Sequence, residues 1–140
     1  MRLLLTVFAA LSLTSAGCAA RTTPLPDDSD ARWVPSTTNP ALSRLDLLGA
    51  PSAGGPFRYL LRVPDGFSIA THRHNIDLTA VVRRGEQHIT IEEPGKPPRT
   101  HVLKPGDRLV IPAGVLHRES WHAPTVVDLS GVGPMATTSP

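Results

Sequence analysis

Residues 66–74 read GFSIATHRH and contain two histidines, His72 and His74, that are separated by a single residue. Side chains at positions i and i+2 of a strand point to the same face. Both imidazoles can therefore face one ion, while Arg73 points to the opposite face. The turn residues of segment 64–66, Pro-Asp-Gly, predict that this strand begins just after a tight turn.

A second stretch, residues 106–117, reads GDRLVIPAGVLH. Its Pro-Ala-Gly segment predicts a turn that places His117 at the start of a new strand. Either stretch alone is a weak signal, because a lone His-x-His pair on a strand usually faces solvent. His72 and His74 can offer imidazoles to one ion, and His117, at the start of its strand, is a third candidate ligand.

Outward from these stretches, short apolar runs alternate with turns that contain glycine or proline. Regular short strands of this kind are typical of an antiparallel sandwich or barrel. No stretch has a sustained helical period. The pattern predicts nine strands, over residues 44–48, 57–63, 67–74, 78–83, 87–91, 99–103, 108–111, 117–121 and 125–129.

Glycines and a proline flank the three histidines at fixed places. The full set is Gly66, His72, His74, Gly85, Gly106, Pro112, Gly114 and His117. This set resembles the two conserved motifs of the cupin family, and the ending after residue 125 looks like that of small single-domain bacterial cupins. The resemblance covers roughly residues 42–133. It implies an all-β fold, the cupin double-stranded β-helix or jelly-roll barrel.

Two positions depart from the cupin motifs. The glutamate of the first motif belongs at Leu78, and the asparagine of the second belongs at Trp121. Leu78 cannot bind a metal, and Asp77 before it could reach inward only if the loop bends, because a one-residue shift changes the face. The ligand set that the resemblance implies is three imidazoles, from His72, His74 and His117, with open positions. This set fits one divalent transition metal, with Fe, Zn, Ni, Cu and Mn all compatible with imidazole ligands. It resembles the three-His cupin dioxygenases, such as cysteine dioxygenase and diketone-cleaving enzymes.

Three further residues are candidates for the pocket. Gln87 shares a strand face with two isoleucines, and its amide could orient a ligand or a metal-bound water, or it could be a partly exposed strand-end residue. Glu119 points the same way as His117, where it could replace the missing carboxylate, although an ion pair with an arginine is the stronger expectation. His101 has the parity of an interior residue.

The N-terminus has the features of an export signal. Residues 3–13 are apolar apart from one threonine and one serine, which is too short for a membrane span of about 20 residues. Small residues then precede Cys18, the only cysteine, in a pattern that resembles the bacterial lipobox, with serine where leucine is usual. We expect a periplasmic, membrane-anchored lipoprotein with Cys18 as the lipidated residue; ordinary signal cleavage is the alternative.

These features divide the chain into a signal peptide (1–17), a Pro/Thr/Asp/Ser-rich flexible tether (18–41), one cupin domain (42–134) and a tail (135–140). The charges nearly cancel, with 14 Lys and Arg against 12 Asp and Glu, and they form no basic run. Nucleic acid is therefore not an expected partner. Val81 keeps an apolar side chain on the outer face of a strand, and cupins often pair through that face, so we expect a homodimer.

Two functions fit the site. One is a metal-dependent enzyme acting on a small molecule, dioxygenase-like if the three-His resemblance holds. The other is a non-catalytic binding, sensing or structural module with a degenerate site. The sequence names neither the substrate nor the metal.

Overall fold

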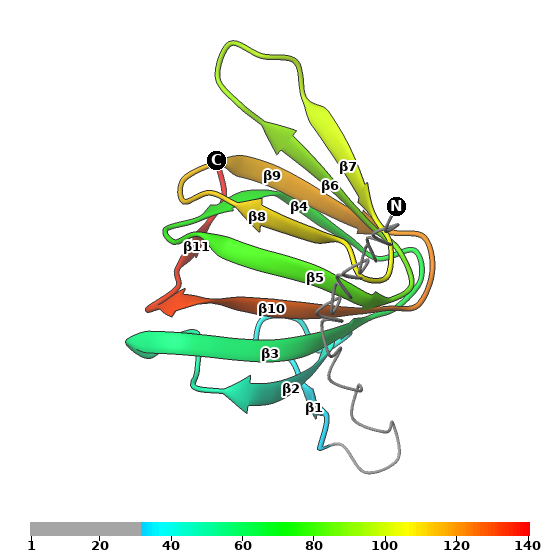
Figure 1. The fold of residues 1–140 in the computed structure, drawn as a ribbon, viewed down its shortest axis with the longest axis vertical. Helices are drawn as coiled ribbons and strands as arrows, with labels where there is room; N and C mark the ends of the chain where they lie inside the picture. Colours follow the sequence, from blue (N-terminus) through cyan, green and yellow to red (C-terminus); the bar gives the residue numbers. More distant parts are fainter. Residues whose placement is uncertain (1–31) are drawn as a thin grey trace, which may run out of the picture.

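The computed structural model describes residues 32–140, which form eleven strands (Figure 1). Within this part of the chain no helix is long and apolar enough to cross a membrane. The strands are β1 (Val34–Pro35), β2 (Ser43–Leu48), β3 (Gly55–Val63), β4 (Ser68–His74), β5 (Leu78–Arg84), β6 (Gln87–Glu92), β7 (Arg99–Leu103), β8 (Arg108–Ile111), β9 (Leu116–Trp121), β10 (Thr125–Gly133) and β11 (Thr137–Thr138).

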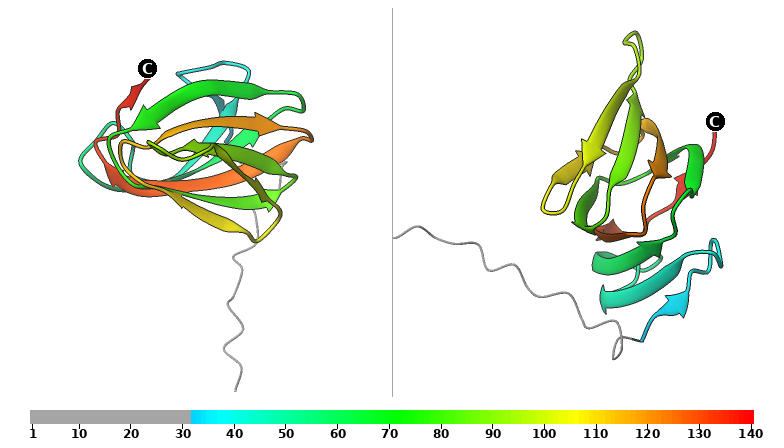
Figure 2. Two further views of the ribbon diagram at one scale, coloured as in Figure 1. Left: turned by 90° about the horizontal axis from the view of Figure 1, so that it is seen from above. Right: turned by 90° about the vertical axis from the view of Figure 1, so that its right-hand side faces the viewer.

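Two antiparallel sheets face each other and enclose the core (Figure 2). The first sheet has the order β1-β2-β3-β10-β5-β8, and the second has the order β11-β4-β9-β6-β7. Successive strands mostly alternate between the two sheets, which is the connectivity of a jelly roll. β8 lies at one edge of the first sheet and β7 at one edge of the second, and no hydrogen-bond ladder joins these two strands. The β6–β7 hairpin extends beyond the rest of its sheet (Figure 1).

All nine predicted strands are present, with ends that differ by a few residues at most. The largest difference is β10, which continues to Gly133 where the sequence predicted an end at residue 129. Glycine weakens a strand in general, but Gly131 allows a close approach here, because a side chain at this position would meet Phe57 and Ile76. The two-residue strands β1 and β11 were not predicted, since two residues show no alternation.

An irregular ladder between β4 and β9 determines which residues of β4 face the interior. Ile69 lies opposite Glu119 and His72 lies opposite His117, so β4 has one residue more than β9 in this interval. Such a β-bulge reverses the alternation of faces along the strand. Ile69 and His72 can therefore both face the core, although they are three residues apart.

The core is apolar and continuous. It joins the inner faces of both sheets into one cluster. Its fully buried aromatic members are Phe57 on β3 and Trp121 on β9. The remaining members of the cluster are Leu42, Tyr59, Leu61, Val63, Leu78, Ala80, Val82, Ile89, Leu103, Ile111, Val127 and Leu129.

The middle of the first sheet contains a buried ion-pair network. Asp128 on β10 is 3% exposed and accepts hydrogen bonds from Arg58 on β3 and Arg83 on β5. Burial by itself would raise the pKa of the Asp128 carboxyl. The two arginines outweigh that effect and lower the pKa below its ordinary value.

The N-terminal end of the described chain lies against the domain. The guanidinium of Arg62 lies 3.9 Å from the centre of the Trp33 ring, and Val34 pairs with Arg44 on β2. The predicted signal peptide, Cys18 and the tether up to residue 31 lie outside the described residues.

Candidate metal centre

The structure brings His72, His74 and His117 together. The first two extend from β4 and the third from β9, and all three are buried. The ring centroids are 4.9 Å apart for His72 and His74, 4.2 Å for His72 and His117, and 5.2 Å for His74 and His117. One ring nitrogen from each residue lies within 4.8 Å of the other two, a group that could hold one metal ion.

Backbone carbonyls fix the orientation of two of the rings. Nδ1 of His72 lies 2.9 Å from the carbonyl oxygen of Ala70, and Nδ1 of His117 lies 3.0 Å from that of Val115. A carbonyl can only accept, so each Nδ1 carries the proton and each Nε2 presents its lone pair. Nε2 of His117 is buried and has no hydrogen-bond partner among the described residues. A bound metal would satisfy this nitrogen.

The third ring is oriented by the C-terminal segment. Nδ1 of His74 lies 3.0 Å from the hydroxyl oxygen of Thr137, which pairs with His74 in the β4–β11 ladder. Thr137 falls in the segment that the sequence delimited as a tail. A single threonine 63 residues away along the chain gives no signal that could have identified this contact.

Burial favours the neutral, metal-binding form of two of the imidazoles, those of His74 and His117. Burial, together with the neighbouring His72 and His117, lowers the pKa of His74 to about 4. Burial also lowers the pKa of His117, against the hydrogen bond to Val115 that raises it. Metal binding requires neutral imidazole. A buried group of three imidazole side chains fits a divalent transition metal.

The two residues that depart from the cupin motifs have apolar side chains and lie in the core. Leu78 and Trp121 are buried members of the apolar core. The loop does not turn the carboxylate of Asp77 inward, because this carboxylate accepts a hydrogen bond from the backbone N–H of Ala113 at 2.8 Å. The group of potential ligands therefore contains no carboxylate.

Gln87 and Glu119 form a polar pair inside the barrel. Gln87 is 1% exposed, so the alternative of a partly exposed strand-end residue is wrong. Its Nε2 donates to Oε1 of Glu119 at 3.1 Å, and its Oε1 is buried without a partner among the described residues. Burial raises the pKa of Glu119 to about 7, against the hydrogen bond from Gln87 that lowers it. Its hydrogen-bond partner is this amide and not the expected arginine.

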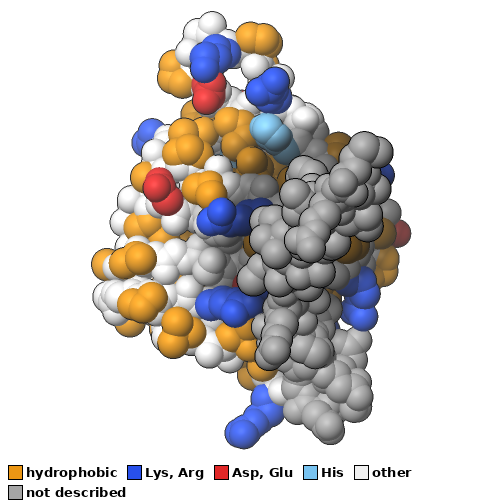
Figure 3. Space-filling view, viewed as in Figure 1, with side chains coloured by type: hydrophobic (Ala, Val, Ile, Leu, Met, Phe, Trp, Pro, Cys, Tyr) orange, Lys and Arg blue, Asp and Glu red, His pale blue; other side chains and the backbone are white. Residues whose placement is uncertain are grey.

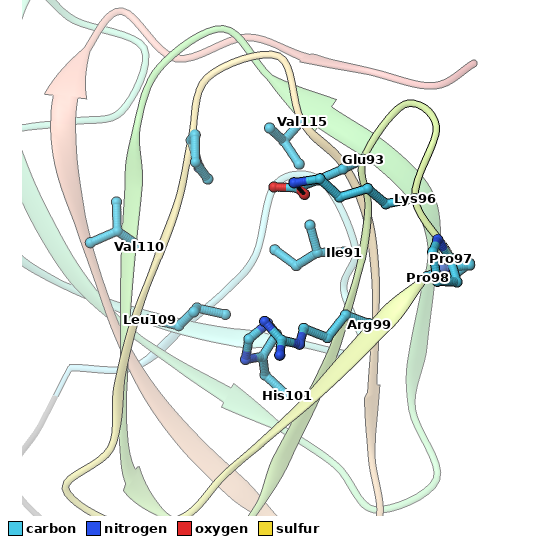
Figure 4. Close-up of a pocket in the computed structure, with 11 residues that line it drawn as sticks. Ile91, Glu93, Lys96, Pro97, Pro98, Arg99, His101, Leu109, Val110 and Val115 are labelled. Atoms are coloured by element: carbon cyan, nitrogen blue, oxygen red, sulfur yellow. Dashed lines mark hydrogen bonds and ion pairs between the residues drawn. The ribbon is translucent and has the colours of Figure 1, made fainter.

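His101 lies at the margin of the interior. It faces the same way as its ladder partner Ile89 and is partly buried, outside the three-His group. It lines a groove of about 580 Å³ between the β6–β7 hairpin and β8 (Figure 4). His88, in contrast, lies on the outer side of the second sheet with its Nε2 at 2.7 Å from Glu86.

Comparisons with solved structures identify the fold. KdgF from Halomonas sp. superposes with a TM-score of 0.60 and 20% identity over 80% of this chain and 96% of that chain. Salicylate 1,2-dioxygenase from Pseudaminobacter salicylatoxidans superposes with a TM-score of 0.60 and 17% identity, over 74% of this chain and 32% of that chain. An oxalate decarboxylase variant from Bacillus subtilis superposes with a TM-score of 0.60 and 16% identity, over 76% of this chain and 28% of that chain. This chain thus spans about a third or less of the length of the dioxygenase and of the decarboxylase.

No family model matches the chain, and no curated protein matches it in sequence. The structural neighbours are cupins, and the two antiparallel sheets share their arrangement. The chain has the cupin fold, an all-β jelly roll. The likeness to these neighbours, at 16–20% identity, is a likeness of fold.

Proposed function

We propose that this chain binds one divalent transition metal through His72, His74 and His117 and acts there on a small molecule. Two observations carry the proposal: Nε2 of His117 is buried without a partner among the described residues, and each of the three histidines offers one ring nitrogen within 4.8 Å of the other two. A buried acceptor without a hydrogen bond costs about 1–3 kcal/mol, and a metal removes that cost.

The protein's own residues would supply positioning around the ion. Three imidazoles leave open coordination positions for a substrate or water, and a bound metal supplies Lewis-acid or redox chemistry there. The free Oε1 of Gln87 can accept a hydrogen bond from a molecule in the interior. The apolar core around it, which includes Leu78 and Trp121, excludes bulk water.

Metal analysis of purified variants tests the ligand set. We expect His72→Ala, His74→Ala and His117→Ala to lose most of the metal that the wild type retains, since two ligands hold an ion poorly. Glu119→Gln should keep it, because Glu119 lies outside the group. His88→Ala is the matched control, a histidine on the outer face. Full metal retention by His117→Ala would overturn the three-histidine site.

A non-catalytic binding or sensing module is the second candidate. It is favoured by Leu78, which leaves an apolar side chain where most cupins have a metal-binding carboxylate. Oxygen uptake by the Fe²⁺-loaded protein separates the two, with cysteine and pentane-2,4-dione as first compounds because the resemblance is to enzymes acting on a thiol and on diketones. Uptake that is absent from His117→Ala supports the enzyme. Metal binding without uptake for any compound favours the sensing module.

We also propose that the chain is exported and anchored through a lipid on Cys18. The support is the short apolar N-terminal stretch followed by Ala16, Gly17 and the only cysteine. Fractionation of cells should place the wild type with membranes and Cys18→Ser in the soluble periplasmic fraction. A wild-type protein that is already soluble there would contradict the lipid anchor and leave the metal site unaffected.

A further inference from the structure

The groove lies where the two sheets part. β7 ends one sheet and β8 ends the other, and no ladder joins them. The floor and far wall are apolar, formed by Ile91 on β6, Leu109 on β8 and Val115 after it. The volume of about 580 Å³ is within the range of small-molecule sites.

The ladder registers place one wall of this groove in the same row of residues as two of the three histidines. On the second sheet His117 lies opposite His72 on one side and opposite Ile91 on the other, and Ile91 in turn lies opposite Arg99. These four residues form one row across β4, β9, β6 and β7. Neighbouring strands are about 4.8 Å apart, so the Arg99 backbone lies roughly 10 Å from that of His117. Ile91 fills the interval between them.

Two side chains with hydrogen-bond donors lie at the outer end of this row. Arg99 and His101 extend side by side from β7 into the groove, near Leu109 (Figure 4). The space-filling view shows Lys or Arg side chains on the protruding hairpin and a histidine with apolar side chains below them (Figure 3).

Arg99 has no hydrogen-bonded carboxylate partner among the described residues that line the groove. Among residues 32–140, Glu93 is the only acidic residue that lines the groove. Its carboxylate pairs with Lys96 at 2.5 Å, and Arg99 interacts with it only through space. Arg99 forms no hydrogen bond or ion pair with any residue in the described range 32–140. An arginine fork with free donors matches a carboxylate in geometry and charge.

We propose that the groove binds a small organic acid, with its carboxylate on Arg99 and His101 and its apolar body on Ile91 and Leu109. The opposite end of the molecule reaches the metal held by the three histidines. The inference rests on the proposed metal site and adds the substrate class and a specificity residue, Arg99.

Carboxylate-tailed metal chelators provide the probe. The monohydroxamates of the straight-chain diacids from succinic to suberic acid bind divalent metals at one end and carry a carboxylate at the other. Their methyl esters have the same chelating group and no charge. Affinities of both series for the Zn²⁺-loaded protein are measured by titration. At the chain length that spans the row, the acid should bind about tenfold more tightly than its ester, as expected for one charge-assisted contact.

Two variants locate the contact. Arg99→Gln should reduce the preference for the acid to about one, with unchanged ester affinity and zinc content. Arg118→Gln is the matched control, because Arg118 on β9 pairs with Glu92 and does not line the groove. It should keep the wild-type preference.

The outcomes separate this inference from the function it rests on. The wild type could bind zinc and show equal affinities for the acid and its ester at every chain length. That result would overturn the inference and leave the metal site unaffected. A preference that survives Arg99→Gln would overturn it as well. A wild type that retains no zinc would overturn the metal site, and the inference with it.

Discussion

Nδ1 of each of the three clustered imidazoles forms a hydrogen bond, and for His74 the partner is the side chain of Thr137. Replacing Thr137 by valine removes this contact and keeps the shape of the side chain. We expect zinc affinity to fall about tenfold, the lower end of the effect of losing a partner behind a metal ligand. Competition with a chromogenic chelator measures it.

The neighbouring Thr138 supplies the control. Its hydroxyl lies 3.3 Å from Nε of Arg73, which points away from the site. Thr138→Val should therefore leave zinc affinity unchanged. Equal losses in both variants would mean that β11 matters only as a strand and that the hydroxyl of Thr137 does not orient His74.

Leu78 offers the opposite experiment, a ligand added to the site. A glutamate at this buried position would place a carboxylate where cupin motifs have one, and without metal it would be an unpaired charge in the core. We expect Leu78→Glu to unfold at a lower temperature than the wild type when metal-free and to recover most of the difference with Zn²⁺. Leu78→Gln, which carries no charge, should show a smaller recovery. Thermal unfolding with and without the ion measures both.

At the scale of elements, most of the fold could be predicted because strands and turns have local signals. All nine predicted strands are present, and their turns contain the glycines and prolines that marked them. The grouping of His72 with His74 also followed from a spacing of two. The bulge in β4 could not be predicted, since regular alternation would turn Ile69 and His72 to opposite faces. Bulges depend on the partner strand, which a local pattern does not specify.

Long-range contacts explain the other features of the site that could not be predicted from the sequence. The partner of Glu119 was expected to be an arginine, but the strand register places Gln87 beside it. Arg99 had no signal at all, because its role depends on a row of residues across four strands. The three candidate ligands could be found from the motifs, and Gln87 and Glu119 from strand parity, whereas the hydrogen bonds that join these residues to distant partners could not.

The turn between β5 and β6 requires glycine at position 85. Gly85 has a φ of +82°, and a Cβ there would lie 2.4 Å from Oγ1 of Thr125 and 2.6 Å from the carbonyl oxygen of Pro124. We expect Gly85→Ala to reduce the free energy of unfolding by on the order of 2 kcal/mol or more. Gly95→Ala is the control, with a φ of +73° and open space, and should cost about 1 kcal/mol. Urea unfolding compares them; equal losses would exclude the contacts with Pro124 and Thr125 as a cause.

The ion-pair network in the first sheet joins three strands. Removing the charge of Asp128 leaves the Arg58 and Arg83 guanidinium groups without their carboxylate. We expect Asp128→Asn to lose about 3 kcal/mol of stability at neutral pH. The pKa of Asp128 is lowered in the folded state, so its stabilisation is present above the unfolded value of about 3.9 and is lost as pH falls through the folded value.

Urea unfolding at several pH values tests this linkage. The stability difference between wild type and Asp128→Asn should be constant near neutral pH and shrink below about pH 4. Asp46→Asn is the control, because Asp46 pairs with Arg44 at the surface with half of its side chain exposed. That change should cost less than about 1 kcal/mol. A pH-independent difference for Asp128→Asn would contradict the assignment of the lowered pKa to the folded state.

At the scale of the whole molecule, the candidate metal centre and the hydrophobic core share one interior. Trp121 is two residues from Glu119 on the inner face of β9, and Ile91 is both a neighbour of His117 and a contact of the core. Unfolding of the core would therefore disperse the three histidines, which come from β4 and β9. An ion that binds the folded state alone must stabilise the entire domain.

This linkage gives a quantitative expectation for the folded chain. At a free Zn²⁺ concentration one hundred times the dissociation constant, the free energy of unfolding should rise by about 2.7 kcal/mol, and it should continue to rise with the logarithm of zinc concentration. Ca²⁺, which prefers oxygen ligands, should have no effect at the same concentration. His117→Ala should show no zinc-dependent rise, whereas His88→Ala should behave as the wild type. Thermal unfolding across a zinc series measures the slope, and a wild-type slope of zero would show that the three histidines do not act together on one ion.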